Sequence, residues 1–333
     1  MRKLSHFLNL ARIYKSYCLK LTNCNYYPIR IWIELSSRCN LKCRFCVNKN
    51  LPPNQKGDMD FNLYKKIIDD ISGKVYDINL FHRGEPLLNK DVIPMIAYAS
   101  KSGIKTRIHT NATLLDKELS RSIILSGLDL ISFSFDGYIK EIYEKNRSGA
   151  NFEESLANII NFLKIKKQLG AKKPYTIIQI IQYRESVSTS ETIMQKKIFL
   201  KNFENLPLDK LISRIPHNWG GLLKIEGLKK IRTKDRRIIP CTFPWYSLTI
   251  FYDGRVFLCP QDFEGKICLG DVNKNKINEI FNGKIIKSIR EAFKEGAIEN
   301  IIPCRDCDRI RRKTFMKIPR EYLGVFIRDN LRS

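Results

Sequence analysis

The sequence predicts an α/β protein built on a parallel sheet, followed by a smaller region of mixed strands and helices. Apolar, β-branched runs alternate with amphipathic stretches as far as His217, an order typical of right-handed βαβ units. Beyond His217 the pattern changes to short strands, a hairpin turn and short helices. The chain has 333 residues, of which 43% are hydrophobic, so it is long enough for two folded parts and too apolar to be disordered.

Most predicted strands of the first part are short runs of apolar and β-branched residues, and all but the last are followed by an amphipathic stretch. The predicted strands are 30–35, 77–82, 105–110, 129–135, 175–182 and 211–216. The predicted helices are 62–71, 90–101, 116–126, 153–167 and 191–203. Six such units fit either a doubly wound sheet or an incomplete (β/α) barrel, and periodicity alone does not separate the two.

The second part begins with a predicted hairpin, because Asp253 and Gly254 lie between two apolar runs, 247–251 and 256–258. Short helices are predicted at 276–281 and 284–293. We therefore expect five segments in the chain. They are an N-terminal basic helix (1–27), a main domain (28–220), a basic linker (221–238), a small domain (239–312) and a basic tail (313–333).

The N-terminus does not resemble a secretory signal, because Arg12, Lys15 and Lys20 interrupt its apolar residues and no small-residue cleavage site follows. No apolar run of about 18 residues occurs, which argues against a membrane-spanning helix. We expect a cytoplasmic protein with reduced cysteines. The N-terminal helix either docks on the main domain or lies on a membrane surface or partner.

The net charge of +25 results from 59 Lys and Arg against 34 Asp and Glu. The excess is spread along the chain, and no recognisable nucleic-acid-binding module accompanies it. We therefore expect no specific nucleic acid. A small polar or anionic substrate and weak membrane-surface association through the basic N-terminus are the partners that this charge favours.

Three of the ten cysteines form a C-x3-C-x2-C motif directly after the first strand, at Cys39, Cys43 and Cys46. A structural zinc site needs four ligands, and no fourth Cys or His lies nearby. A [4Fe–4S] cluster held by three thiolates keeps one iron open for another ligand. The spacing therefore favours such a cluster over zinc.

This motif resembles the signature of the radical S-adenosylmethionine (radical SAM) superfamily. Four further motifs, each at or near a predicted strand end, resemble those of the family over about residues 28–215. They are His-Arg-Gly-Glu-Pro at 82–86 (where the family usually has Gly in place of Arg83), Thr-Asn-Ala at 110–112, Ser-Phe-Asp-Gly at 134–137 and Arg-Ser-Gly at 147–149. The resemblance implies a partial (β/α)6 TIM barrel.

The resemblance also implies how SAM is held. Its amino and carboxylate groups would chelate the open iron, Glu85 would accept hydrogen bonds from its ammonium, and Arg147 would pair with its carboxylate. Asn111 and Ser134 would hydrogen-bond its carboxylate or ribose. Phe45, Gly84 and Pro86 complete the expected cofactor-binding set.

A second set of cysteines, Cys241, Cys259, Cys304 and Cys307, lies downstream. Four thiolates hold either zinc or a complete iron–sulfur cluster, and the spacing alone leaves both open. Their arrangement resembles the SPASM/Twitch accessory domains of radical SAM enzymes. The shorter Twitch form, with one auxiliary [4Fe–4S] cluster, fits better, because no cysteine follows Cys307. The spacing is similar to that of the radical SAM aminocyclitol dehydrogenases. Cys18, Cys24 and Cys268 receive no role.

The resemblance implies reductive cleavage of SAM, hydrogen abstraction by a 5′-deoxyadenosyl radical, and an electron donor such as flavodoxin or ferredoxin. Two clusters favour a two-electron oxidation of a carbohydrate or aminocyclitol alcohol, with the auxiliary cluster as electron acceptor. Peptide or protein maturation, through thioether formation or side-chain oxidation, is the alternative enzyme class. A zinc-stapled, non-enzymatic binding protein is a third hypothesis. His217 and Asp262 are candidate bases, and either could instead be a turn or packing residue.

Overall fold

One nine-stranded sheet runs through the computed structural model, which describes residues 2–181, 190–214, 216–224 and 241–310 and two short strands at 314–315 and 318–319. The strand order is β6-β5-β4-β3-β2-β1-β7-β8-β9. The first six strands are β1 (Arg30–Ile33), β2 (Asp77–Asn79), β3 (Lys105–Thr110), β4 (Leu130–Ser134), β5 (Tyr175–Ile181) and β6 (Lys210–Arg214). All of the neighbouring pairs among them are parallel.

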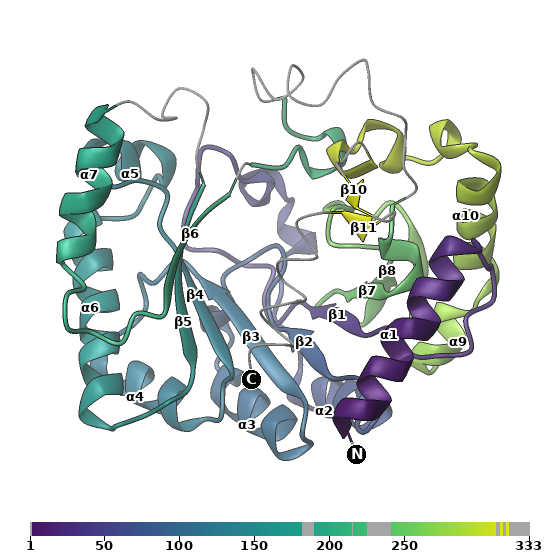
Figure 1. Cartoon of the computed structure of the whole chain (residues 1–333), viewed down its shortest axis with the longest axis horizontal. Coiled ribbons are helices and arrows are strands. Elements are labelled where there is room, and N and C mark those ends of the chain that lie inside the picture. Colours follow the sequence, from purple (N-terminus) through teal and green to yellow (C-terminus); the bar gives the residue numbers. More distant parts are fainter. Residues whose placement is uncertain are drawn as a thin grey trace.

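The order of these strands decides between the two architectures that periodicity leaves open. β1 to β6 follow one another across the sheet in sequence order, whereas a doubly wound sheet reverses its order at a switch point. Figure 1 shows the connecting helices along the outer side of the curved sheet. They are α2 (Phe61–Ile71), α3 (Val92–Lys101), α4 (Lys117–Leu125), α5 (Lys140–Asn146), α6 (Phe152–Gln168) and α7 (Ser190–Lys201). The partial barrel is confirmed.

The second part of the chain extends the same sheet. β7 (Ser247–Ile250) pairs in parallel with β1, from Arg30 opposite Ser247 to Ile33 opposite Ile250. β8 (Arg255–Phe257) and β9 (Cys268–Asp271) continue it in antiparallel pairing. The expected hairpin is therefore present, and the barrel is joined to the C-terminal part by backbone hydrogen bonds.

Short helices α9 (Ile277–Phe281) and α10 (Lys284–Glu295) close this part, and the two-residue strands β10 (Thr314–Phe315) and β11 (Ile318–Pro319) pair with each other. Most of the expected basic linker 221–238 and basic tail 313–333 lies outside the described residues. α5 and β9 are not among the predicted elements; both are too short to show a clear period in the sequence.

The core lies between the sheet and its outer helices. Ile31, Ile78, Ile108 and Ile131 come from four adjacent strands and are fully buried there. Side chains alternate between the two faces of a strand, so the residues between these isoleucines line the inner face of the curved sheet.

The N-terminal helix α1 (Arg2–Cys18) packs on the C-terminal part of the chain (Figure 1). Tyr17 is buried edge-on against Trp245, with their ring centroids 5.5 Å apart, and Trp245 Nε1 donates to the carbonyl of Leu21 at 2.8 Å. Leu8, on another side of the helix, is 54% exposed. No helix in the described ranges is long and apolar enough to cross a membrane.

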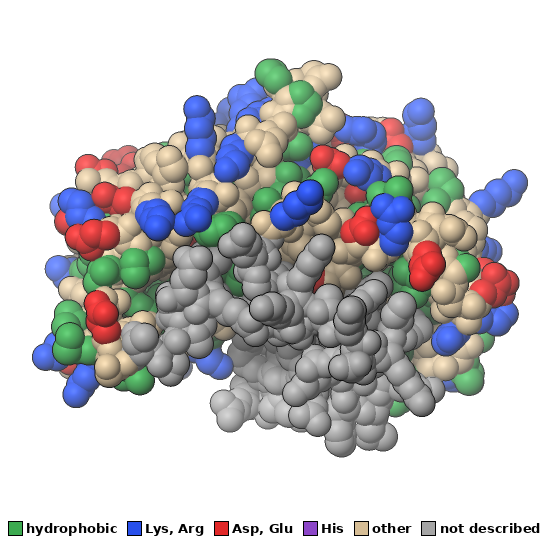
Figure 2. All heavy atoms as spheres, turned by 90° about the horizontal axis from the view of Figure 1, so that it is seen from above, with side chains coloured by type: hydrophobic (Ala, Val, Ile, Leu, Met, Phe, Trp, Pro, Cys, Tyr) green, Lys and Arg blue, Asp and Glu red, His purple; other side chains and the backbone are tan. Residues whose placement is uncertain are grey.

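A fully buried arginine holds the segment after α1 to the C-terminal part. Arg290 of α10 donates to the carbonyls of Thr22, Pro244 and Phe281 at 2.8–3.0 Å. Elsewhere the positive charge is dispersed: Figure 2 shows Lys and Arg side chains scattered over the coloured part of the face it displays, with Asp and Glu between them.

Candidate cofactor sites

The three-cysteine loop follows β1 at the carboxyl edge of the barrel, where ligands bind in such folds. Cys39, Cys43 and Cys46 are half-buried there. Two backbone bonds fix the loop to the segment after α5, because the amide of Lys42 donates to the Ser148 carbonyl and that of Arg44 to the Asn146 carbonyl, both at 2.9 Å.

The three thiols lie close enough together to change one another's charge state. Burial raises the pKa of all three, to about 11 for Cys39 and about 12 for Cys46, and neighbouring thiols of the motif raise both values further. The Arg147 guanidinium lowers all three pKa values, so it lies within electrostatic reach of each thiol. Its Nη2 is also 2.9 Å from Oδ2 of buried Asp136.

Gly84 and Glu85 lie directly beside this loop. A Cβ on Gly84 would stand 2.2 Å from the carbonyl oxygen of Arg38 and 2.5 Å from that of Ser36, so only glycine permits this approach. The amide of Glu85 donates to the same Arg38 carbonyl at 2.8 Å. The second-strand loop is thereby packed against the residue that precedes Cys39.

The Glu85 carboxylate is buried, and its two oxygens accept the amides of Leu87 at 3.1 Å and Asn111 at 2.7 Å. Burial raises its pKa to about 7, although these two hydrogen bonds and Arg147 act in the opposite direction. The charge of Glu85 raises the pKa of Cys39, so this carboxylate faces the thiols.

The other expected SAM contacts also surround the loop. Asn111 donates from Nδ2 to Asn40 Oδ1 at 2.8 Å and so ties the loop after β3 to the cysteine loop. Ser134 ends β4 and is half-buried. Phe45 lies under the guanidinium of Arg44, 4.9 Å from it, and Pro86 is buried at the start of a short helical turn after Glu85.

The second cysteine group gathers beside the barrel. Cys259, Cys304 and Cys307 are buried and Cys241 is half-buried. Burial raises the pKa of Cys259 and Cys304 well above the usual value and that of Cys307 to about 12, and each of these three pKa values is raised further by Cys241.

Both groups fit iron–sulfur clusters. Each consists of thiols that are removed from bulk water and lie within electrostatic reach of one another. In the described part of the chain no three Cys, His, Asp or Glu side chains lie close enough to share a single metal ion. A cubane binds each thiolate at a different iron, so its ligands stand farther apart than those of a single ion.

The two candidate bases lie next to the second group. The ring of His217 contacts Arg309 through Nε2 and faces Asp308, with Nδ1 3.7 Å from Oδ2. Asp262 is buried, and its two oxygens accept the amides of Lys266 and Ile267 at 2.8 and 2.7 Å, which closes the loop after Cys259. Burial raises its pKa.

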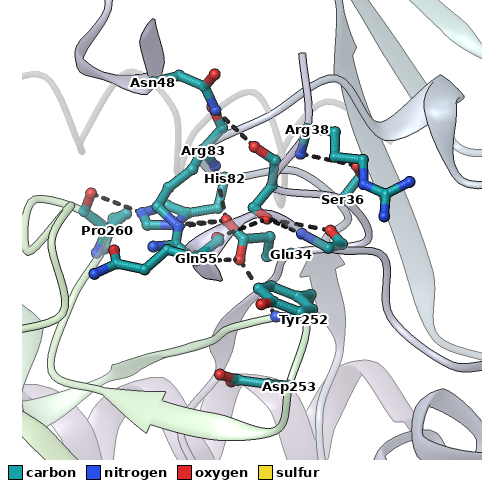
Figure 3. Close-up of polar contacts among 12 residues, drawn as sticks. Glu34, Ser36, Arg38, Asn48, Gln55, His82, Arg83, Tyr252, Asp253 and Pro260 are labelled. Atoms are coloured by element: carbon teal, nitrogen blue, oxygen red, sulfur yellow. Dashed lines mark hydrogen bonds and ion pairs between the residues drawn. The ribbon is translucent and has the colours of Figure 1, made fainter. Parts of the chain in front are cut away.

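Sequence analysis missed a buried ion pair between the two cysteine groups (Figure 3). Arg83 donates from Nε and Nη2 to the two carboxylate oxygens of Glu34, both at 2.7 Å. Burial alone would raise the pKa of Glu34, but two hydrogen bonds from Arg83, together with His82, whose Nδ1 lies 3.7 Å from Oε1, outweigh it and lower the pKa to about 2. The sequence contained two signals of this pair. Glu34 is a charged residue inside a predicted apolar strand, and Arg83 stands where the motif usually has glycine.

The inner face of the barrel carries polar and flat aromatic groups. The rings of Phe81 and His109 stack with their centroids 3.9 Å apart, and burial, together with Arg214 and Arg107, lowers the pKa of His109 to about 3. Among the described residues, Asn79 Nδ2 and Ser132 Oγ are buried on this face without a hydrogen-bond partner. Buried polar atoms of this kind typically form hydrogen bonds to a bound polar molecule.

Comparison with known proteins agrees with this geometry. The model of the radical SAM superfamily matches residues 33–170, and that of the iron–sulfur cluster-binding domain SPASM matches residues 241–308. The chain therefore contains a radical SAM domain and a SPASM domain. The first implies SAM and a [4Fe–4S] cluster, and the second implies auxiliary iron–sulfur clusters; radical SAM enzymes generally need a reductant such as flavodoxin.

Two relatives and one solved structure illustrate the similarity. A tungsten-containing aldehyde ferredoxin oxidoreductase cofactor-modifying protein of Pyrococcus furiosus is 28% identical over 53% of this chain, and the match spans less than half (46%) of that relative. The S-adenosyl-L-methionine-dependent 2-deoxy-scyllo-inosamine dehydrogenase of Niallia circulans is 22% identical over 85% of this chain and 94% of its own. The crystal structure of BtrN in complex with AdoMet and 2-DOIA superposes with a TM-score of 0.56 at 19% identity, over 84% of this chain and 92% of that one.

Proposed function

We propose that this protein dehydrogenates an alcohol group of a small polar substrate of the carbohydrate or aminocyclitol type. The gathering of three buried cysteines and the half-buried Cys241 next to the barrel is the observation that carries the proposal. Oxidation of an alcohol to a carbonyl removes one hydrogen atom, one proton and one electron, so it needs an electron acceptor near the substrate. The dehydrogenase similarity over 85% of the chain supports the same reaction.

The chain's own residues divide this work. Cys39, Cys43 and Cys46 would hold the first cluster, with Arg147 and Glu85 placed for the carboxylate and ammonium of SAM. When bound, these cofactors supply a carbon-centred radical that abstracts hydrogen, and an auxiliary cluster supplies a one-electron acceptor. Cys241, Cys259, Cys304 and Cys307 would hold the auxiliary cluster.

As the base that accepts the substrate's proton, we propose His217 in preference to Asp262. The side chain of His217 is 28% exposed and lies beside buried Asp308, which can orient its ring. Asp262 is buried, and each of its oxygens already accepts a backbone amide. Its geometry supports a role in holding the loop.

The inner face supports a substrate of modest size. The unpartnered polar atoms of Asn79 and Ser132 lie on this face in β2 and β4, on either side of β3, and the stacked Phe81–His109 pair offers a flat surface on the same face. Hydrogen-bonding groups beside an aromatic surface are typical of carbohydrate-like ligands. No specific nucleic acid partner is proposed.

The test compares Cys304→Ala with Cys39→Ala in anaerobically reconstituted protein. Wild-type protein should contain about eight irons per chain and each variant about four. Cys39→Ala should lose 5′-deoxyadenosine release. Cys304→Ala should keep it and lose oxidation of a deuterated polyol or aminocyclitol, whose deuterium marks the abstracted atom. Substrate oxidation by Cys304→Ala would disprove the proposal, and deuterium transfer from a peptide but from no polyol would favour the maturation class.

A further inference from the structure

The segment 82–85 contacts both cysteine groups, and its central feature is the Arg83–Glu34 ion pair. Glu34 is fully buried and Arg83 is 3% exposed. The pair is bidentate, with both N–O distances at 2.7 Å, which permits only one relative orientation of the two groups. The two residues are 49 positions apart in the chain.

On one side, this segment contacts the part of the chain that carries the second cysteine group. The Arg83 guanidinium lies 3.6 Å from the centre of the Phe251 ring, and Glu34 Oε2 accepts the amide of Tyr252 at 3.3 Å. His82 Nε2 lies 3.0 Å from the carbonyl oxygen of Pro260, the residue after Cys259. Figure 3 shows the contacts of Glu34 with Arg83 and Tyr252 and that of His82 with Pro260.

On the other side, the same segment contacts the first cysteine loop. Asn48, two residues after Cys46, donates from Nδ2 to the carbonyls of Ser37 at 2.7 Å and Arg83 at 2.9 Å. Gly84 packs against the backbone of the residues before Cys39. Four consecutive residues therefore join the two cofactor loops.

Stability alone does not explain this pair. Burying two charges is costly, and well-packed apolar residues of similar volume often serve as well. The Nη1 group of Arg83 is buried without a partner in the described part of the chain, which adds to that cost. Glycine, the usual residue of the motif at this position, has no side chain that could reach Glu34.

We propose that Arg83 is a positioning residue that fixes the loop of Cys259 against the three-cysteine loop through its bidentate pair with Glu34. The inference rests on the two cofactor sites of the proposed function and deepens it, because it names the residue that sets their relative placement. A misplacement of about 1 Å between reacting groups can reduce a rate by about a hundredfold.

The test uses the double variant E34Q/R83M, which removes both charges and leaves no uncompensated charge in the interior. Arg83→Lys keeps the charge but offers no planar pair of donors. Arg255→Met is the matched control. Arg255 lies on the β7–β8 hairpin that Arg83 and Glu34 contact, and it pairs with Asp253 while its side chain is 47% exposed.

The first measurement is alkylation of Cys259 by iodoacetamide in the full chain without cofactors, followed by mass spectrometry. We expect Cys259 to be labelled about tenfold faster in E34Q/R83M and in Arg83→Lys than in wild type. A tenfold change corresponds to a decrease of about 1.4 kcal/mol in the free energy of local opening. Arg255→Met should match wild type. Labelling of both Arg83 variants at the wild-type rate would overturn the inference.

The second measurement is the distance distribution between the two reduced clusters, obtained by pulsed EPR on reconstituted protein without SAM. Wild type and Arg255→Met should give one narrow distribution, and both Arg83 variants should lose it. A narrow wild-type distribution in either Arg83 variant would contradict a positioning role. Since neither measurement uses a substrate, both can support the inference even if the proposed dehydrogenation is wrong.

Discussion

A methyl group at position 84 should disturb the first cofactor site specifically. The Cβ of Gly84→Ala would stand 2.2 Å from the Arg38 carbonyl oxygen, and ordinary contact begins at 3.4 Å. One of the two segments must therefore move by 3.4 − 2.2 = 1.2 Å. All of the atoms in the way belong to the backbone of residues 36–38, so no flexible side chain can yield.

Adding a methyl group to a packed site costs about 1–3 kcal/mol, and we expect the upper end here because the opposing atoms are backbone. The displaced residues lead directly into Cys39, so assembly of the first cluster should suffer as well. We expect the free energy of unfolding of cofactor-free protein in urea to fall by about 3 kcal/mol. Iron per chain after anaerobic reconstitution should fall from about eight towards about four, and SAM binding by calorimetry should be lost.

Gly73→Ala provides the control. Gly73 has φ of +74°, and nothing lies within 4 Å of its Cβ position, so alanine there adds backbone strain of about 1–2 kcal/mol without a collision. This variant should keep about eight irons. If Gly84→Ala were as stable as the control and retained full iron content, the close packing would not govern the site.

The remaining predictions concern three buried charged groups. Burial raises the pKa of Glu85 from 4.5 to about 7, so its contribution to stability is present below pH 4.5 and lost as the pH rises to 7. Over this range the free energy of unfolding of cofactor-free wild type should fall by about 3 kcal/mol more than that of Glu85→Gln. An equal pH dependence of the two proteins in urea titrations would refute this. Asp262→Asn should lower the unfolding free energy by about 1–3 kcal/mol and leave SAM cleavage intact, whereas loss of cleavage would contradict a loop-closing role. Arg290→Met should cost about 3 kcal/mol or more because three buried carbonyls lose their donor, and Arg290→Lys should not restore the loss, as thermal unfolding will show.

Much of the cofactor chemistry followed from local sequence. The spacing of Cys39, Cys43 and Cys46 places three thiols on one short loop whatever surrounds it, and the SAM motifs fall at strand ends, which converge in any parallel barrel. The predicted strand 105–110 matches β3 at both ends because the turn residues Gly103 and Asn111 flank it.

The contacts between distant segments were not predictable in this way. Sequence analysis treated Glu34 as part of an apolar strand and Arg83 as a departure from a glycine motif, and nothing local joined them. Asp136 lay inside a recognised motif, yet its pairing with Arg147 depends on how the loops after β4 and α5 fold over the cysteine loop.

By itself, the sequence determined the close spacing of Cys39, Cys43 and Cys46 and the alternation of strands and helices, since each of these depends on neighbours a few residues apart. Only the tertiary structure decided that β7 pairs with β1 and that Glu34 and Arg83 form a buried ion pair beside that junction. The physical reason is that such pairings depend on which strand ends become neighbours in space, and a pattern along the chain does not contain that information.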